Sequence, residues 1–280
     1  MTDYTRHKMA TTSVTVSASV FVPTDLLGKR LSTISGFIDQ EECDKLIKRG
    51  DERGWQKSSV SGGGHGRKGC ENPVTNSFSV LADQTVADDF WSKLKKIVPD
   101  NASFLGNNTY FDSTTKGTEW TKYGIYPHLR LYKYDKNDVF PEHDDYKIRK
   151  KIVDEDGTQT IYMSFLTLLV YLNDDFSGGQ TCYWPDRKGV HCRFKSGDDK
   201  ASGKKEPQIR IKPISGMAVI QDQNIMHEAL APGNGTKYIL RTDILYKRVI
   251  KPNPKLPPPG KRTEGSYEKV FEASCKNYAL

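Results

Sequence analysis

Apolar and polar residues alternate with a period of two along much of the chain from residue 129 onward. Six segments show this pattern and are predicted to be strands: 129–134, 163–172, 180–184, 207–212, 216–222 and 237–246. Runs typical of turns separate most of them, with the sequences NDDFSGG, SGDDKASGKK, PISG and APGNG. So many short strands predict a mainly β protein with a sandwich or barrel at its core.

Two helices are predicted ahead of these strands. Asp39 and Glu42 have the spacing of a capping box, and the residues that follow form an apolar stripe: Cys43, Leu46 and Ile47. A second helix is expected after Thr85 and before Pro99, from apolar residues at helical spacing: Val86, Phe90, Leu94, Ile97 and Val98. We expect these helices to form a layer outside the β core.

The ends of the chain differ in composition from its middle. Residues 1–28 are predicted to be a flexible N-terminal segment, residues 29–247 the folded domain, and residues 248–280 a proline-rich arm followed by a short helix. The glycine-rich segment 58–73 separates the two predicted helices. It fits a floppy surface loop and a mobile lid equally well.

Composition excludes several classes of protein. A hydrophobic content of 36% and a charged content of 28% over 280 residues are those of a globular chain. The net charge is +7, but the basic residues are scattered, which argues against nucleic-acid binding. Five cysteines without a CxxC pair argue against a disulfide framework or a structural zinc site. Neither a signal peptide nor a membrane span is recognised, so a cytoplasmic protein is expected.

One short segment, PEHDDYK at 141–147, combines a histidine with carboxylates. Alone it would fit a solvated turn, but His143 and Asp145 lie two residues apart and share a face if the backbone is extended. A second histidine, His227, follows in IQDQNIMHEAL, and Lys237 lies ten residues beyond it. Two histidines and one carboxylate form the facial triad of non-heme Fe(II) oxygenases, which leaves the remaining metal positions open.

This ordered set resembles the 2-oxoglutarate- and Fe(II)-dependent dioxygenases, and among them the prolyl 4-hydroxylase type. The resemblance covers roughly residues 30–247 and includes LRLYKYDKNDVFPEHDD, FLTLLVYLNDDFSGGQT and PISGMAVIQDQNIMHEA. It implies a double-stranded β-helix core of the jelly-roll or cupin-like kind. It also implies that His143, Asp145 and His227 bind iron, with 2-oxoglutarate and dioxygen as co-substrates and ascorbate as a candidate reductant.

The resemblance also assigns residues to the co-substrate. Lys237 would pair with the distal carboxylate of 2-oxoglutarate, because a buried cation requires an anionic partner. Tyr134 and Thr167 would add hydrogen bonds, and Tyr171 is a further candidate on the same strand face as Thr167. For the two tyrosines, ordinary filling of the barrel is the alternative.

The substrate is less constrained. Asp243 stands six residues after Lys237, where prolyl hydroxylases of this type tend to carry a tryptophan. Together with Arg241 it suggests a substrate site for a small amino-acid-like or anionic molecule, which would be hydroxylated, desaturated or cyclised.

Arg241 could instead support the co-substrate or pair with an acid. The alternatives are a peptidyl-proline substrate, in a groove beside residues 61–66 and 248–260, and a non-catalytic ligand-binding barrel. The oligomeric state stays open.

Overall fold

The structure, a computed structural model, describes residues 24–58, 74–105, 119–185 and 207–251. The glycine-rich loop from residue 59 onward and the predicted C-terminal helix lie outside these residues. Among the described helices, none has the length and apolar character needed to cross a membrane.

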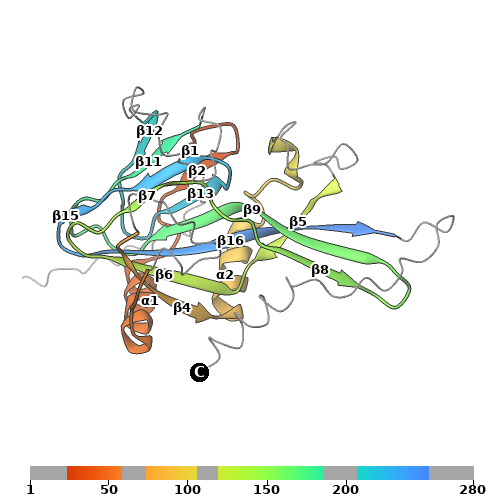
Figure 1. Ribbon diagram of the computed structural model, residues 1–280, viewed down its shortest axis with the longest axis horizontal. Helices are drawn as coiled ribbons and strands as arrows, with labels where there is room; N and C mark the ends of the chain where they lie inside the picture. The colour runs from red at the N-terminus through yellow and green to blue at the C-terminus, as the bar shows by residue number, and fades with distance from the viewer. Residues whose placement is uncertain (1–23, 59–73, 106–118, 186–206, 252–280) are drawn as a thin grey trace, which may run out of the picture.

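A ten-stranded antiparallel sheet forms the larger part of the molecule (Figure 1). Its main path runs β1-β2-β13-β9-β16-β6-β4-β3, with β5 beside β16 and β8 beside β9. The strands are β1 (Thr24–Asp25), β2 (Leu31–Ile34), β3 (Gln56–Lys57), β4 (Ser77–Ala82), β5 (Thr121–Ile125), β6 (His128–Tyr134), β8 (Arg149–Val153), β9 (Gln159–Tyr171), β13 (Ala218–Asp222) and β16 (Lys237–Ile250).

A second, four-stranded sheet has the order β12-β11-β14-β7. Its strands are β7 (Phe140–His143), β11 (Thr181–Trp184), β12 (Ile209–Ile211) and β14 (Met226–Ala229). A two-stranded sheet joins β10 (Ser177–Gly178) to β15 (Pro232–Asn234), so part of the APGNG segment predicted as a turn is paired strand. Two antiparallel sheets with a shared apolar interior confirm the predicted double-stranded β-helix core with flanking helices.

The alternation of side chains along β9 explains how one strand serves two cores. Leu168 and Val170 face the helices, in the cluster that includes residues of both helices. Leu169 and Tyr171 face the other way, in a cluster shared with Tyr183 of the second sheet. Because both faces are covered, the strand is apolar at almost every position.

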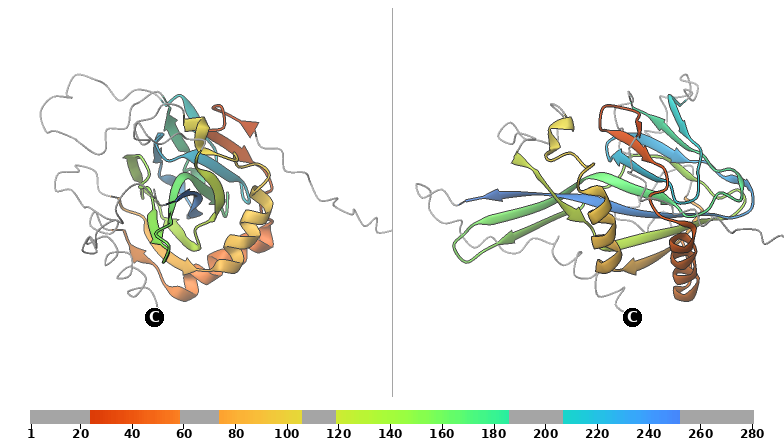
Figure 2. Two further views of the ribbon diagram at one scale, coloured as in Figure 1. Left: turned by 90° about the vertical axis from the view of Figure 1, so that its right-hand side faces the viewer. Right: turned by 180° about the vertical axis from the view of Figure 1, so that it is seen from behind.

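Two helices cover the outer face of the large sheet (Figures 1 and 2). Helix α1 (Gln40–Arg53) begins at the predicted capping box, where Asp39 and Glu42 bond to each other's backbone. Helix α2 (Gln84–Leu94) is capped by Asp83, so it starts before Thr85 and ends well short of Pro99. Ile97 and Val98 lie beyond the helix and still pack against the same core. A short 3₁₀ helix spans Ala102–Leu105.

The first predicted domain boundary lies in the turn between β1 and β2, and the second lies inside β16. β1 lies within the segment 1–28 that was expected to be flexible, and it pairs with β2. β16 continues to Ile250, three residues past the predicted end of the folded domain at residue 247. The far ends of β9 and β16 project from the body together with β8, which the sequence pattern did not predict (Figure 1). All five residues of β8 are exposed, so it carries no apolar alternation to recognise.

Candidate metal centre

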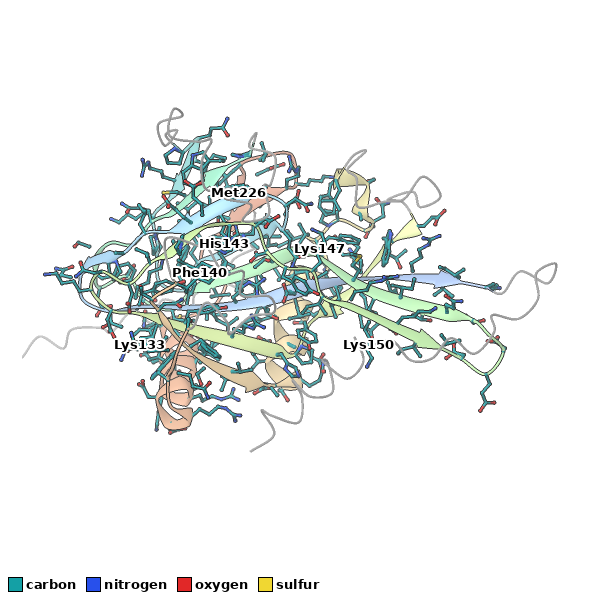
Figure 3. All side chains as sticks on the ribbon, in the orientation of Figure 1. Lys133, Phe140, His143, Lys147, Lys150 and Met226 are labelled. Carbon is teal, nitrogen blue, oxygen red and sulfur yellow. The ribbon has the colours of Figure 1, made fainter. Side chains whose placement is uncertain are left out.

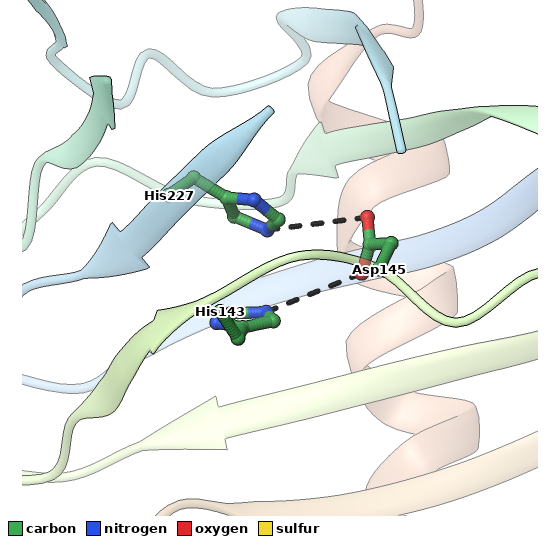
Figure 4. A group of neighbouring side chains, drawn as sticks. All are labelled: His143, Asp145 and His227. Atoms are coloured by element: carbon green, nitrogen blue, oxygen red, sulfur yellow. Dashed lines mark ion pairs between the residues drawn. The ribbon is translucent and has the colours of Figure 1, made fainter. Parts of the chain in front are cut away.

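Two histidines that are far apart in sequence face each other across the second sheet. In the pairing of β7 with β14, His143 lies opposite His227, and their ring centroids are 4.2 Å apart. Asp145 follows β7 directly, and its backbone N–H donates to the carbonyl oxygen of Gln223 at 2.9 Å. The sheet register therefore brings together the three predicted metal ligands (Figure 4).

The donor atoms of this triad lie within bonding reach of one small ion. One donor atom from each of His143, Asp145 and His227 can be chosen so that all lie within 4.8 Å of one another. His143 Nε2 is 4.0 Å from Asp145 Oδ1, and His227 Nε2 is 3.9 Å from Asp145 Oδ2. Their side chains are 19%, 5% and 6% exposed for residues 143, 145 and 227, so the site is nearly dry.

Hydrogen bonds fix both imidazoles in the tautomer that a metal requires. His143 Nδ1 lies 2.7 Å from the carbonyl oxygen of Pro141, and His227 Nδ1 lies 2.9 Å from that of Ile225. A carbonyl oxygen can only accept, so Nδ1 carries the proton in each ring and Nε2 keeps its lone pair. Bonds of this kind orient metal-binding histidines. Phe140 stacks on His143 with 4.0 Å between ring centroids and supports the ring from one side (Figure 3).

Gln221 holds the carboxylate and one ring from the side. Its Nε2 donates to Asp145 Oδ2 at 3.0 Å and lies 3.1 Å from Nε2 and 3.4 Å from Nδ1 of His227. Nearly equal distances to both ring nitrogens place the amide over the face of the ring, because a donor along the Nε2 lone pair would be much farther from Nδ1. That lone pair therefore stays directed away from Gln221. Tyr183 completes the set by donating to Gln221 Oε1 at 2.7 Å.

Asp145 is kept ionised although it is buried. Burial alone would raise its pKa. The Arg241 guanidinium, 3.0 Å from Oδ1, and the neighbouring histidines and Thr167 together outweigh that effect, so the pKa lies well below the usual range. The Thr167 hydroxyl adds a 2.6 Å bond to Oδ2. Burial and the neighbouring His227 lower the pKa of His143 to about 3, so its ring is neutral at physiological pH. An ionised carboxylate together with two imidazole nitrogens is a donor set that Fe(II) accepts.

Arg241 belongs to a buried chain of polar groups. Its Nη2 lies 3.0 Å from Asp145 and 3.3 Å from Asp243 Oδ1. Asp243 also accepts from Gln223 at 2.6 Å, and Gln223 accepts from the Ser164 hydroxyl at 3.0 Å. Burial raises the pKa of Asp243, with Arg241 opposing it. Both predicted substrate residues are thus engaged with each other beside the metal ligands. Their role toward a substrate stays a prediction.

Lys237 lies in a separate pocket on the same face of β16. It is fully buried, and its Nζ donates to the carbonyl oxygen of Gly179 at 2.7 Å. The rings of Tyr134 and Tyr171 surround it, with centroids 5.1 Å and 5.7 Å from Nζ. Burial lowers the pKa of Lys237 to about 7. In the described part of the chain no carboxylate pairs with this ammonium, which agrees with a place prepared for an anion.

The co-substrate candidates differ in how they are engaged. Tyr134 lies opposite Lys237 in the pairing of β6 with β16. Tyr171 instead bonds through its hydroxyl to Thr181 at 2.7 Å. Thr167 bonds to the metal-ligand carboxylate, so it contacts the triad and not the lysine pocket.

Sequence reasoning missed Gln221, Gln223 and Tyr183. Gln221 had a detectable signal, since it is a polar residue at an inward position of the apolar segment GMAVIQD. Gln223 lies in a turn after β13, where no periodicity applies.

No protein-family model matches this chain, and no curated protein matches it. Solved structures with similar coordinates include a viral collagen prolyl hydroxylase from Paramecium bursaria Chlorella virus-1 in complex with 2OG. It is 18% identical, with a TM-score of 0.43, over 78% of this chain and 97% of that one. A Pseudomonas putida prolyl-4-hydroxylase is 13% identical, with a TM-score of 0.44, over 77% and 92% of the two chains. The non-heme alpha ketoglutarate dependent epimerase SnoN from nogalamycin biosynthesis is 13% identical, with a TM-score of 0.43, over 84% and 87%.

Proposed function

We propose that this chain is an Fe(II)- and 2-oxoglutarate-dependent oxygenase, with iron on His143, Asp145 and His227. The observation that carries the proposal is the β7–β14 register, in which the imidazoles of His143 and His227 lie opposite each other beside the ionised carboxylate of Asp145. When bound, Fe(II) with 2-oxoglutarate and dioxygen supplies oxidative decarboxylation to succinate and CO₂ and oxidation of an unactivated C–H bond.

The protein contributes position, charge and exclusion of water. Thr167 and Gln221 hold one oxygen of Asp145, and Arg241 holds the other, so the carboxylate has one orientation. Lys237 would bind the distal carboxylate of 2-oxoglutarate and so orient the keto-acid end toward the triad. Because Asp145 and His227 are buried and His143 is only partly exposed, the protein limits the access of water to the ligands.

For the substrate we propose a small anionic or amino-acid-like molecule. Arg130 lies opposite Arg241 in the pairing of β6 with β16. Arg130 is exposed, whereas the side chain of Arg241 is only 13% exposed. Arg241 is already paired with Asp145 and Asp243. The exposed guanidinium of Arg130 on this face is therefore the group that favours a carboxylate in the substrate. Asp243 occupies the position of the family's tryptophan and would suit an ammonium group.

A protein substrate is the second candidate, and the projecting ribbon of β8, β9 and β16 favours it. Ile152, Val153 and Val249 are 39%, 53% and 54% exposed on this ribbon. Ile152 and Val249 both pair with Thr160 and so share one face of the ribbon. Exposed apolar side chains side by side are typical of surfaces that contact another protein.

The metal assignment is tested by anaerobic titration of Fe(II) and 2-oxoglutarate, read as a charge-transfer band in visible light. Wild type should develop the band, and His227→Ala should lose it while keeping its circular dichroism spectrum. Absence of the band in wild type would favour a non-catalytic barrel. Succinate formation with free amino acids, small dicarboxylates and proline-rich peptides then separates the two substrate classes.

A further inference from the structure

A buried asparagine directly before β4 lacks well-formed hydrogen bonds among the described residues. Asn76 is 0% exposed, and neither its Oδ1 nor its Nδ2 makes a hydrogen bond of normal geometry in the described part of the chain. The amide nevertheless lies close enough to the Tyr134 phenol to oppose the rise that burial causes in the pKa of that group. No other described side chain is buried with two unpaired polar atoms, since Trp120 and Arg241 leave one each. A buried amide without partners destabilises a protein, so such a group calls for a ligand or a bound water.

The strand register places Asn76 in one row with Tyr134 and Lys237. Ser77 of β4 pairs with Lys133 of β6, so Asn76 is the neighbour of Tyr134. Tyr134 in turn pairs with Lys237 of β16. Phe78 belongs to the inner core cluster, and Asn76, two residues before it, shares that face. The three side chains therefore form a row across three strands on the inner face.

All members of this row are buried and compatible with one anion. Asn76 and Lys237 are 0% exposed, and Tyr134 is 1% exposed. The ammonium of Lys237 bonds to one carbonyl oxygen and retains two further protons to donate. The amide of Asn76 has two protons to donate and one oxygen to accept. A carboxylate with four lone-pair sites matches this set of donors.

We propose that Asn76 is a third binding residue for the distal carboxylate of a dicarboxylic 2-oxo acid, beside Lys237 and Tyr134. The Nδ2 group donates to a carboxylate oxygen, and Oδ1 accepts from the ammonium or the phenol of the same pocket. This assignment rests on the proposed function, and it adds a residue that selects for the second carboxylate of 2-oxoglutarate.

The test is calorimetric binding to the Mn(II)-loaded protein under anaerobic conditions, with 2-oxoglutarate and with 2-oxopentanoate, which lacks the distal carboxylate. Asn76→Leu keeps the side-chain volume and removes both polar atoms. It should weaken 2-oxoglutarate by about 10-fold to 100-fold, as expected for hydrogen bonds to a charged group. Binding of 2-oxopentanoate should be unchanged. Asn76→Ser, which keeps one donor, should give an intermediate loss.

Each result has a distinct meaning. If wild type binds no 2-oxoglutarate, the proposed function fails. If wild type binds it and Asn76→Leu binds it equally well, the asparagine assignment fails alone. Equal losses for both ligands would also overturn it, because the amide would then act on the shape of the pocket.

Stability provides a second measurement that does not depend on binding. Asn76→Leu should leave the ligand-free protein at least as resistant to urea as wild type, since an unpaired amide is replaced by an apolar group of similar size. A clearly less stable variant would mean that the amide is already satisfied, for instance by water, and would overturn the proposal.

Discussion

Two basic side chains on the inner face of β16, four residues apart, are buried in opposite ways. Arg241 lies between Asp145 and Asp243, at 3.0 Å and 3.3 Å. Lys237 has a carbonyl oxygen and two aromatic rings around it. Burial lowers the pKa of both, but the carboxylates reverse this for Arg241, whose pKa is raised, while that of Lys237 falls to about 7.

The difference separates a structural cation from a binding cation. Arg241 is compensated by the protein itself, so it stabilises the fold and the metal ligand without any ligand present. Lys237 is stabilised fully only when an anion enters from outside, which is the property of a binding site. Substitutions of the two residues should therefore have opposite effects on stability.

The largest effect is expected for Arg241→Met. This change leaves two buried carboxylates without their common cation, which should lower the free energy of unfolding by about 3–5 kcal/mol. Urea unfolding of the metal-free protein at pH 7 measures it. Arg248→Met is the matched control, because Arg248 pairs with the half-exposed Glu119 and should cost no more than about 1 kcal/mol. Similar losses in both variants would remove the distinction between the two cations.

The pH dependence of stability should come next in size. Lys237 has a pKa of about 7 in the folded protein against the ordinary 10.5 when exposed in the unfolded chain. Between these values the unfolded chain binds more protons, so the free energy of unfolding rises with pH, by at most about 1.4 kcal/mol per unit. The difference between wild type and Lys237→Met, measured by urea unfolding from pH 7 to 10, isolates this contribution. Saturating 2-oxoglutarate should reduce this dependence of the unfolding free energy on pH. If Lys237→Met showed the same dependence as wild type, Lys237 would not be its source.

At pH 7 alone, Lys237→Met should make the ligand-free protein more stable, by about 1–2 kcal/mol, because an unpaired buried ammonium is replaced by an apolar side chain. The same variant should lose 2-oxoglutarate affinity by about 10-fold to 100-fold. Lys45→Met serves as the control, since Lys45 is exposed and pairs with Glu41 on the surface of α1. A destabilised Lys237→Met would mean that the protein already compensates the ammonium.

The sequence predicted the strands of the large sheet whose two faces pack against the two hydrophobic clusters. β6 and β16 have polar residues between apolar ones, whereas β9 and β13 are buried on both faces and are largely apolar, and all four were recognised as strands. β7 contains a proline and is half-buried throughout, and β8 is exposed throughout, so neither shows a period of two. These two strands form because they pair with other strands, and the local sequence pattern does not reveal that pairing.

The residues of the site also differ in how visible they are in the sequence. The spacing of His143 and Asp145 is local and visible, and the resemblance supplied His227 and Lys237. The partners of Arg241 were left open because they depend on the register of β16 against its neighbours and on the side-chain rotamer. Asn76 had no signal at all, since its significance lies in a missing partner.

The smallest effect is expected for Tyr171→Phe, which asks whether the second ring beside Lys237 contributes its hydroxyl to binding. That hydroxyl is already bonded to Thr181 at 2.7 Å. Its removal should cost about 1 kcal/mol of stability and change 2-oxoglutarate affinity less than about threefold. Calorimetry of the two tyrosine variants provides the comparison, because Tyr134→Phe alters the row that contains Asn76 and should weaken binding more. A larger loss for Tyr171→Phe would place the anion on the other side of the lysine and count against the row.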